Sequence, residues 1–150
     1  MFLWRISSHS TLDGRGGLQA SGRWHTEGRR IVYLAETPAG ALVEVLVHLE
    51  LDPAHFPQYY RLLKAEAPEN LPARTITPSE LPGNWIADQI TTRTVGDEWL
   101  ASKMTVLLRV PSVIVPETFN VLLNPERADA ARVQVLWHEQ YPWDTRLLSR

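Results

Sequence analysis

The sequence predicts a single α+β domain, because segments with strand patterns and segments with helix patterns are mixed along the chain without regular strand–helix–strand alternation. The 150 residues suit one ordinary domain with one core. The composition, with 44% apolar and 21% charged residues, is typical of a globular protein and not of a disordered or fibrous one. We therefore expect residues 1–150 to form one compact domain.

The N-terminal part is predicted to hold two strands on either side of a long glycine-rich loop. Residues 2–7 (FLWRIS) are rich in β-forming side chains and precede a turn-rich stretch, which favours a strand. Residues 9–28 form an irregular segment with five glycines, and so long a loop inside a compact domain is usually functional. Residues 31–35 (IVYLA) are typical of a buried strand.

The next segment predicts a helix over residues 39–50, which Asp52-Pro53 ends. Thr37 is a suitable N-cap, and Pro38 suits the first helical position because its missing N–H would have no partner there. A core-facing stripe is expected at the i, i+3, i+4, i+7 spacing of Leu42, Val45, Leu46 and Leu49. A helix with so much apolar surface is expected to be buried on several sides.

Glu44 and His48 interrupt this apolar helix and share one of its faces, because they are four residues apart. Folded proteins rarely bury a carboxylate without a partner. Glu44 therefore needs either a structural cation, as in a buried ion pair, or a polar cleft. The pattern of residues alone leaves both alternatives open.

The rest of the chain predicts further strands and one interrupted helix. Residues 59–67 suit a strand or a helix, and the prolines that bracket them closely favour a strand. Residues 68–85 are expected to form a proline-rich surface connection. Residues 85–102 are expected to be helical in two pieces, broken near Thr94–Gly96, with Thr94 or Asp97 as the second cap. Further strands are expected at 105–110, 112–115, 120–123 and 132–137.

Several functional classes are excluded or disfavoured by the composition. The chain has no cysteine, which excludes a disulfide scaffold, a thiolate metal site and a cysteine nucleophile. No apolar run approaches the ~18 residues that a membrane span needs, and the start shows no export signal. The net charge of −2 disfavours direct nucleic-acid binding, for which a basic surface is expected. We expect a cytoplasmic protein without membrane contact.

Positive charge is concentrated near the N-terminus and is carried by arginine. Residues 1–30 contain five arginines against two carboxylates, whereas the whole chain has only two lysines. Arginine presents a planar fork of donors that fits carboxylate and phosphate groups, so this segment predicts a local anion site. Signatures of other chemistry are absent: a phosphate-binding loop, GxGxxG, HExxH, GxSxG and histidines at metal-ligand spacing. No metal is therefore expected.

Short motifs spread over nearly the whole chain occur in a fixed order. They are Trp4-Arg5-Ile6, Ser21-Gly22-Arg23-Trp24, Val32-Tyr33-Leu34-Ala35, Ala41–Leu49, Gly96-Asp97-Glu98-Trp99, Val110–Pro116, Asn120–Pro125 and Trp143–Leu147. Each motif alone is weakly specific, whereas the ordered set resembles the RES domain, a family named for an arginine, a glutamate and a serine. One departure is His25, which stands where many members have asparagine.

The resemblance implies a fold similar to the ADP-ribosyltransferases, with strands wrapped around a dinucleotide cleft. It also implies a toxin that degrades NAD by phosphorolysis, with protein ADP-ribosylation in some members. The implied partner is an Xre-type antitoxin, which carries the DNA-binding domain and forms a hetero-oligomer with the toxin. By motif, the arginine of the family maps to Arg23, the glutamate to Glu44 and the serine to Ser112, with Tyr33 as a further active-site residue.

These residue types suit the implied chemistry, with NAD as substrate, inorganic phosphate as co-substrate and no other cofactor. Loss of nicotinamide develops positive charge on the ribose, which a fixed carboxylate such as Glu44 stabilises. Arg23 suits a pyrophosphate or phosphate, Tyr33 offers an aromatic face to nicotinamide, and Ser112 offers a hydroxyl to orient it or the ribose. Further substrate-binding residues are expected at Arg5, a second anion site, and at Trp24, His48 and Asn124.

Other interpretations stay open. Without the resemblance, Glu44 suits a structural ion pair, Tyr33 a core aromatic, Arg23 a solvated loop residue and Ser112 a turn. At the level of function, the alternatives are a mono-ADP-ribosyltransferase that modifies a host protein, and a non-catalytic module that binds a partner.

Overall fold

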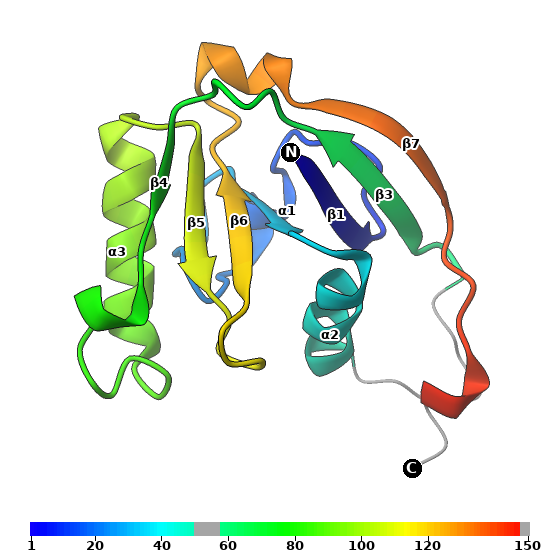
Figure 1. Cartoon of the computed structure of the whole chain (residues 1–150), viewed down its shortest axis with the longest axis horizontal. Coiled ribbons are helices and arrows are strands. Elements are labelled where there is room, and N and C mark those ends of the chain that lie inside the picture. Colours follow the sequence, from blue (N-terminus) through cyan, green and yellow to red (C-terminus); the bar gives the residue numbers. More distant parts are fainter. Residues whose placement is uncertain (50–57, 148–150) are drawn as a thin grey trace.

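The computed structural model describes residues 1–49 and 58–147, which form one curved seven-stranded sheet with helices against it (Figure 1). The strands are β1 (Phe2–Ser7), β2 (Val32–Ala35), β3 (Arg61–Glu66), β4 (Ala73–Thr75), β5 (Leu107–Pro111), β6 (Phe119–Leu123) and β7 (Gln134–Gln140). Their order is β4-β5-β6-β2-β1-β3-β7, and only the β4–β5 pair is parallel. The predicted α+β class is confirmed.

The helices are α1 (Gly16–Gln19), α2 (Pro38–His48) and α3 (Gln89–Ser102), with three short 3-10 turns, η1 (Pro78–Glu80), η2 (Ala128–Arg132) and η3 (Thr145–Leu147). In Figure 1, α3 runs beside β4 and β5, and α2 lies below the place where β2 and β1 meet. None of the helices in residues 1–49 and 58–147 is long and apolar enough to cross a membrane.

Helix α2 begins as the sequence predicts. The Thr37 side chain accepts a hydrogen bond from the Gly40 N–H at 2.9 Å, and Pro38 is the first helical residue. Of the predicted stripe, Val45 is buried together with Ala41 against the sheet, whereas Leu42 and Leu49 are partly buried against the same cluster. The predicted stop at Asp52-Pro53 lies outside the described residues.

The predicted break in the helix after residue 85 is wrong, because α3 is continuous from Gln89 to Ser102 and is capped by Asp88. Gly96 is not a helix breaker but a contact point. A β-carbon there would overlap the carbonyl oxygen of Trp24, so the absence of a side chain lets the loop pack directly on the helix. Asp97 is not a cap: it accepts hydrogen bonds from the backbone and hydroxyl of Thr26.

The strand predicted at 112–115 is also absent. The Ser112 hydroxyl accepts hydrogen bonds from the N–H groups of Ile114 and Val115, at 3.1 and 3.2 Å, and this turns the chain after β5. The loop predicted over 9–28 contains the single turn α1, and the connection over 68–85 contains β4 and η1. Local side-chain hydrogen bonds therefore override the apolar run at 112–115.

The sheet buries apolar side chains on both faces, but its middle is weakly joined. Four residue pairs connect β2 to β6 and six connect β1 to β3, whereas β1 and β2 share only the pair Trp4–Ala35. Beyond that pair the two strands diverge. The sheet therefore consists of two well-paired parts, β4-β5-β6-β2 and β1-β3-β7, with an opening where they meet.

Candidate active site

A pocket of about 610 Å³ lies where β1 and β2 diverge, a size typical of small-ligand sites. Its walls come from these two strands, the loop before β2, helix α2, the first turns of α3 and the turn after β5. Six predicted site residues line it: Arg5, Arg23, Trp24, Tyr33, Glu44 and His48. Segments that are far apart in the sequence thus converge on one pocket.

Glu44 extends from α2 into this pocket and is held by two neutral donors. Its Oε1 accepts a hydrogen bond from the Ser112 hydroxyl at 3.1 Å and one from the Asn120 side-chain amide at 2.7 Å. Within residues 1–49 and 58–147 its carboxylate forms no ion pair. Of the two predicted alternatives for Glu44, the structure has the polar cleft and not the structural cation.

Ser112 contacts Glu44 from outside the pocket lining. Because its oxygen accepts the N–H groups of the turn after β5, its proton is free to point at Glu44 Oε1. The side chain is buried, and Ser112 does not line the pocket. The predicted contact of this hydroxyl with nicotinamide or ribose therefore does not fit the geometry, and we assign Ser112 as a positioning residue.

Asn120 is a site residue that the sequence reasoning missed. It lies on β6 directly beside Ala35 of β2, and its amide donates to Glu44 of α2. The signal was present, since Asn120 is a polar residue in an otherwise apolar strand segment, two residues from the buried Leu122 on the same face.

Tyr33 connects the pocket to the buried His25. The Tyr33 oxygen accepts the Trp24 N–H at 3.1 Å and lies 2.8 Å from His25 Nδ1, which also accepts the Gly22 N–H at 3.2 Å. Since Nδ1 accepts and Nε2 lies 3.3 Å from the Gly17 carbonyl oxygen, we assign the histidine proton to Nε2. The Tyr33 hydroxyl then donates to His25, and Tyr33 presents its ring and an acceptor lone pair.

Burial sets the protonation of this pair. Desolvation raises the pKa of Tyr33, which keeps the phenol protonated. Desolvation also lowers the pKa of His25, against the opposing effect of its hydrogen bonds to backbone carbonyls, so the imidazole is neutral near pH 7. Gly22 is required beside them, because a β-carbon at that position would overlap the Tyr33 hydroxyl.

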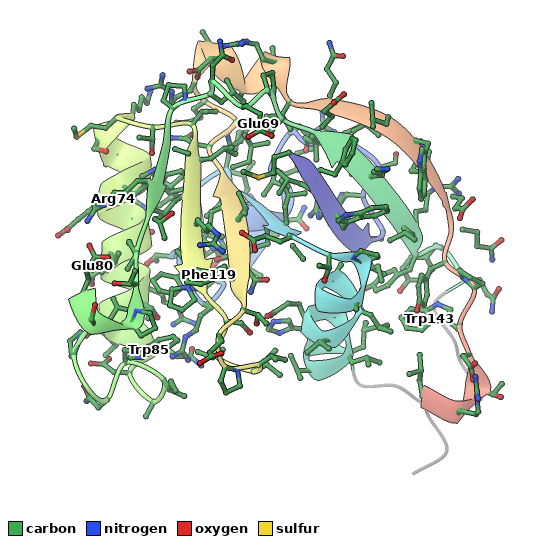
Figure 2. All side chains as sticks on the ribbon, in the orientation of Figure 1. Glu69, Arg74, Glu80, Trp85, Phe119 and Trp143 are labelled. Carbon is green, nitrogen blue, oxygen red and sulfur yellow. The ribbon has the colours of Figure 1, made fainter. Side chains whose placement is uncertain are left out.

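Arg23 and Trp24 follow Gly22 and define the opposite end of the pocket. Nη2 of Arg23 donates to the carbonyl oxygens of Trp85 and Ile86, and its guanidinium carbon lies 6.0 Å from the centre of the Trp85 ring. Figure 2 shows Trp85 at the lower end of α3. Trp24 is almost fully buried, packed toward Trp85 and against the α3 backbone at Gly96.

The other predicted residues divide into three cases. Arg5 lines the pocket from β1 and donates to the Thr11 carbonyl oxygen at 3.3 Å, and desolvation lowers its pKa. His48 lines it from the exposed last turn of α2. Asn124 is not brought to the pocket. It is buried at the other end of β6, where its side chain donates to the Leu100 carbonyl oxygen and accepts the Glu126 N–H.

The pocket thus has the Glu44 carboxylate at the end formed by α2 and β6, and the Arg23 guanidinium at the end formed by the loop before β2 and the chain before α3. Such an arrangement suits a ligand that develops positive charge at one position and carries negative charge at another. Among the residues that the structure describes, no cluster of three or more histidine, aspartate and glutamate side chains is placed to hold a metal ion.

Comparison with known proteins gives concordant matches. The profile of the RES domain family matches residues 2–144. The chain is 46% identical to "Toxin Res" of Pseudomonas putida over 149 residues, covering 98% of this chain and 99% of that protein. It is 34% identical to "Prs ADP-ribosylating toxin" of a Sphingobium species, covering 98% of this chain and 96% of that protein.

A solved structure shares the fold. It is a chain of the crystal structure of the Mycobacterium tuberculosis MbcT–MbcA toxin–antitoxin complex, with a TM-score of 0.74 at 18% sequence identity. The match covers 93% of this chain and 83% of that one. That chain therefore shares the overall architecture of the predicted single α+β domain.

Proposed function

The chain belongs to the RES domain family, and we propose that it is the toxin enzyme of a toxin–antitoxin pair, which degrades NAD by phosphorolysis. The similarity to "Toxin Res" over nearly the full length of both chains supports the toxin role. The observation that carries the enzymatic part is the Glu44 carboxylate, which lines the pocket, is held by two neutral donors and forms no ion pair with any residue that the structure describes.

In the proposed reaction, the bond between ribose C1′ and the nicotinamide nitrogen breaks, and its electron pair stays on nicotinamide, which leaves as a neutral molecule. A phosphate oxygen forms the new bond to C1′, which gives ADP-ribose 1-phosphate. Positive charge accumulates on the ribose between these events. Glu44 stabilises that charge from Oε2, since Oε1 is engaged by Ser112 and Asn120.

Tyr33 lines the same pocket as Glu44 and offers its ring to the nicotinamide. The phosphate groups are held at the end of the pocket that carries Arg23. NAD and inorganic phosphate are therefore substrates in this proposal, and no further cofactor enters. The chemistry needs no acid on the leaving group, because nicotinamide departs without a charge.

The deciding experiment incubates purified protein with NAD in the presence and absence of inorganic phosphate and separates the products by chromatography. We expect phosphate-dependent loss of NAD with equal amounts of nicotinamide and ADP-ribose 1-phosphate. Glu44→Gln is the matched variant and should be nearly inactive while keeping the fold. Intact NAD with phosphate, with water alone and with protein acceptors would rule out the proposal and favour a non-catalytic binding module.

A second candidate, mono-ADP-ribosylation of a host protein, is favoured by the similarity to "Prs ADP-ribosylating toxin" of a Sphingobium species. The bond that breaks is the same, and only the acceptor differs. With NAD labelled in the adenosine part, phosphorolysis leaves the label in a small sugar phosphate, whereas this alternative leaves it on a protein band. The same pocket therefore serves both candidates, and the acceptor distinguishes them.

The proposed partner is an Xre-type antitoxin that binds this chain as a hetero-oligomer and carries the contact with DNA. The likeness of the fold to a chain from a toxin–antitoxin complex supports such a partner. Co-expression with the product of the adjacent gene should restore growth in cells that this chain arrests, and the two proteins should co-purify. The proposed location is the cytoplasm, where NAD and the antitoxin are available.

A further inference from the structure

The pocket contains an arginine that the motifs did not single out. Arg93 lies on α3, one turn after Gln89, and both residues line the pocket. Nε of Arg93 donates to the Gly22 carbonyl oxygen at 2.9 Å, and Nη2 donates to Gln89 Oε1 at 3.0 Å. These bonds fix the guanidinium against the loop that carries Arg23.

The two arginines bring like charges together without a counter-ion. In the part of the chain that the structure describes, neither guanidinium forms an ion pair with a carboxylate. Desolvation lowers the pKa of Arg23, and the positive charge of Arg93 lowers it further. The negative charge of Asp88 opposes this by raising the pKa of Arg23, but the Asp88 carboxylate already accepts hydrogen bonds from the backbone and hydroxyl of Thr91. An anion that binds between two such guanidinium groups relieves their mutual repulsion, so the pair favours a negatively charged ligand.

A second observation points to the same place. Nε of Arg23 is buried and has no hydrogen-bond partner, although buried polar atoms are nearly always paired. The other side of this guanidinium is held by the carbonyl oxygens of Trp85 and Ile86. The protein therefore orients Arg23 without satisfying all of its donors.

We propose that Arg23 and Arg93 together bind a phosphate group, and that Arg93 is a substrate-binding residue which determines specificity for it. The group belongs either to the pyrophosphate of the dinucleotide or to free inorganic phosphate, which share the same charged oxygens. The ligand's identity rests on the proposed function, but the binding itself requires no turnover. Gln89 acts as the residue that positions Arg93.

Calorimetric titration of inorganic phosphate and of ADP-ribose into the Glu44→Gln protein tests this proposal separately from catalysis. Adding Arg93→Gln should weaken binding of one ligand by about 10–100-fold, the range expected for loss of a charge-assisted hydrogen bond pair. Arg74→Gln is the matched control, an exposed arginine on β4 that does not line the pocket, and should leave binding unchanged.

Each outcome has a defined meaning. Weakened phosphate binding alone places the co-substrate between the arginines, and weakened ADP-ribose binding alone places the pyrophosphate there. Unchanged binding of both ligands by Arg93→Gln, or no binding of either ligand before that change, overturns the proposal. Arg93→Lys keeps the charge but loses the fork, so it should retain fold and bind with intermediate affinity.

Kinetics of the active protein add a readout that general damage would not give. Arg93→Gln should raise the KM for the affected substrate by about 10–100-fold and change kcat much less. Gln89→Ala, which leaves the guanidinium charge in place, should raise the same KM by a smaller factor. A fall in kcat with unchanged KM values would contradict the assignment even if NAD cleavage itself is confirmed.

Discussion

The two ends of the pocket carry opposite charges but are built in the same way. At one end, Glu44 is held by the hydroxyl of Ser112 and the amide of Asn120. At the other, Arg23 is held by backbone carbonyl oxygens of the chain before α3. Within residues 1–49 and 58–147, neither Glu44 nor Arg23 forms an ion pair with a side chain of the opposite charge. The comparison shows how a protein fixes a charge in place and yet leaves it available.

A charge that is held by neutral groups differs from a charge in a structural ion pair for a physical reason. A carboxylate and a guanidinium in contact neutralise each other, and a buried pair of this kind contributes to packing more than to reactivity. Neutral dipoles orient a charge without cancelling it, so a bound ligand still experiences most of its field. Arg109 and Glu36, which do form an ion pair elsewhere on the sheet, illustrate the other solution.

The largest expected effect comes from Gly96→Ala, which breaks the arginine end by pushing α3 away from the Trp24 backbone. We expect the free energy of unfolding to fall by about 3 kcal/mol, at the upper end of the usual cost of overpacking, because the clash is with backbone. Denaturant unfolding measures this value. Gly83→Ala is the control, since a β-carbon at Gly83 meets nothing within 4 Å. Equal stability of the two variants would contradict the close packing.

The second effect concerns the carboxylate end, where Ser112→Ala and Asn120→Leu each remove one donor to Glu44 Oε1. Each change should lower kcat by about tenfold, the equivalent of one hydrogen bond to a charged group, with little change in KM. The double variant tests whether the donors act together, by comparing its loss of kcat with the product of the two single losses. Unchanged kcat in both single variants would show that Glu44 needs no positioning.

Tyr33→Phe sharpens the comparison because it leaves both charged side chains in place and disturbs only the loop that carries Trp24 and His25. It removes the acceptor for the Trp24 N–H and the donor to His25, so the free energy of unfolding should fall by about 1–2 kcal/mol. Tyr59→Phe, on an exposed tyrosine, is the control and should be neutral. If Tyr33→Phe is as stable as the unchanged protein, the hydrogen bonds of the Tyr33 hydroxyl to Trp24 and His25 do not stabilise the fold.

The smallest effect is a pH dependence that originates in His25. Desolvation lowers the pKa of His25 in the folded state below the ordinary value of about 6.5, so the unfolded chain binds the proton more readily. Its contribution to stability is therefore present above that pH and is lost as the pH falls. His25→Asn should lose less stability than the unchanged protein between pH 7.5 and 5.5, whereas the exposed His9→Asn should behave like the unchanged protein. An identical loss in both variants contradicts a neutral, buried His25.

Local patterns predicted much of the fold because the interactions concerned are local. The strand at residues 2–7 and the capping of α2 by Thr37 follow from side-chain preferences and from hydrogen bonds within four residues. The continuity of α3 did not follow, because the reason for Gly96 is a contact with Trp24, which lies 72 positions earlier in the sequence. A glycine chosen for close approach looks the same in sequence as one that ends a helix.

The site shows the same division between local and distant causes. The motifs identified Arg23, Tyr33 and Glu44, and the structure places all three in the pocket. Asn120 and Arg93 were missed because their roles depend on which strand lies beside β2 and on where α3 meets the loop. Asn124 is the predicted binding residue of the same motif, but the structure places Asn120 at Glu44 and turns Asn124 to the Leu100 carbonyl oxygen.

The single residue pair between β1 and β2 has a consequence for motion. Few backbone hydrogen bonds must break for the two parts of the sheet to rotate about Trp4 and Ala35, so the packing of Leu3 and Leu63 on Val32 and Leu34 is what resists such a rotation. Local opening of this kind requires far less free energy than global unfolding. The fold thus has its weakest backbone pairing at its centre, directly beside the pocket.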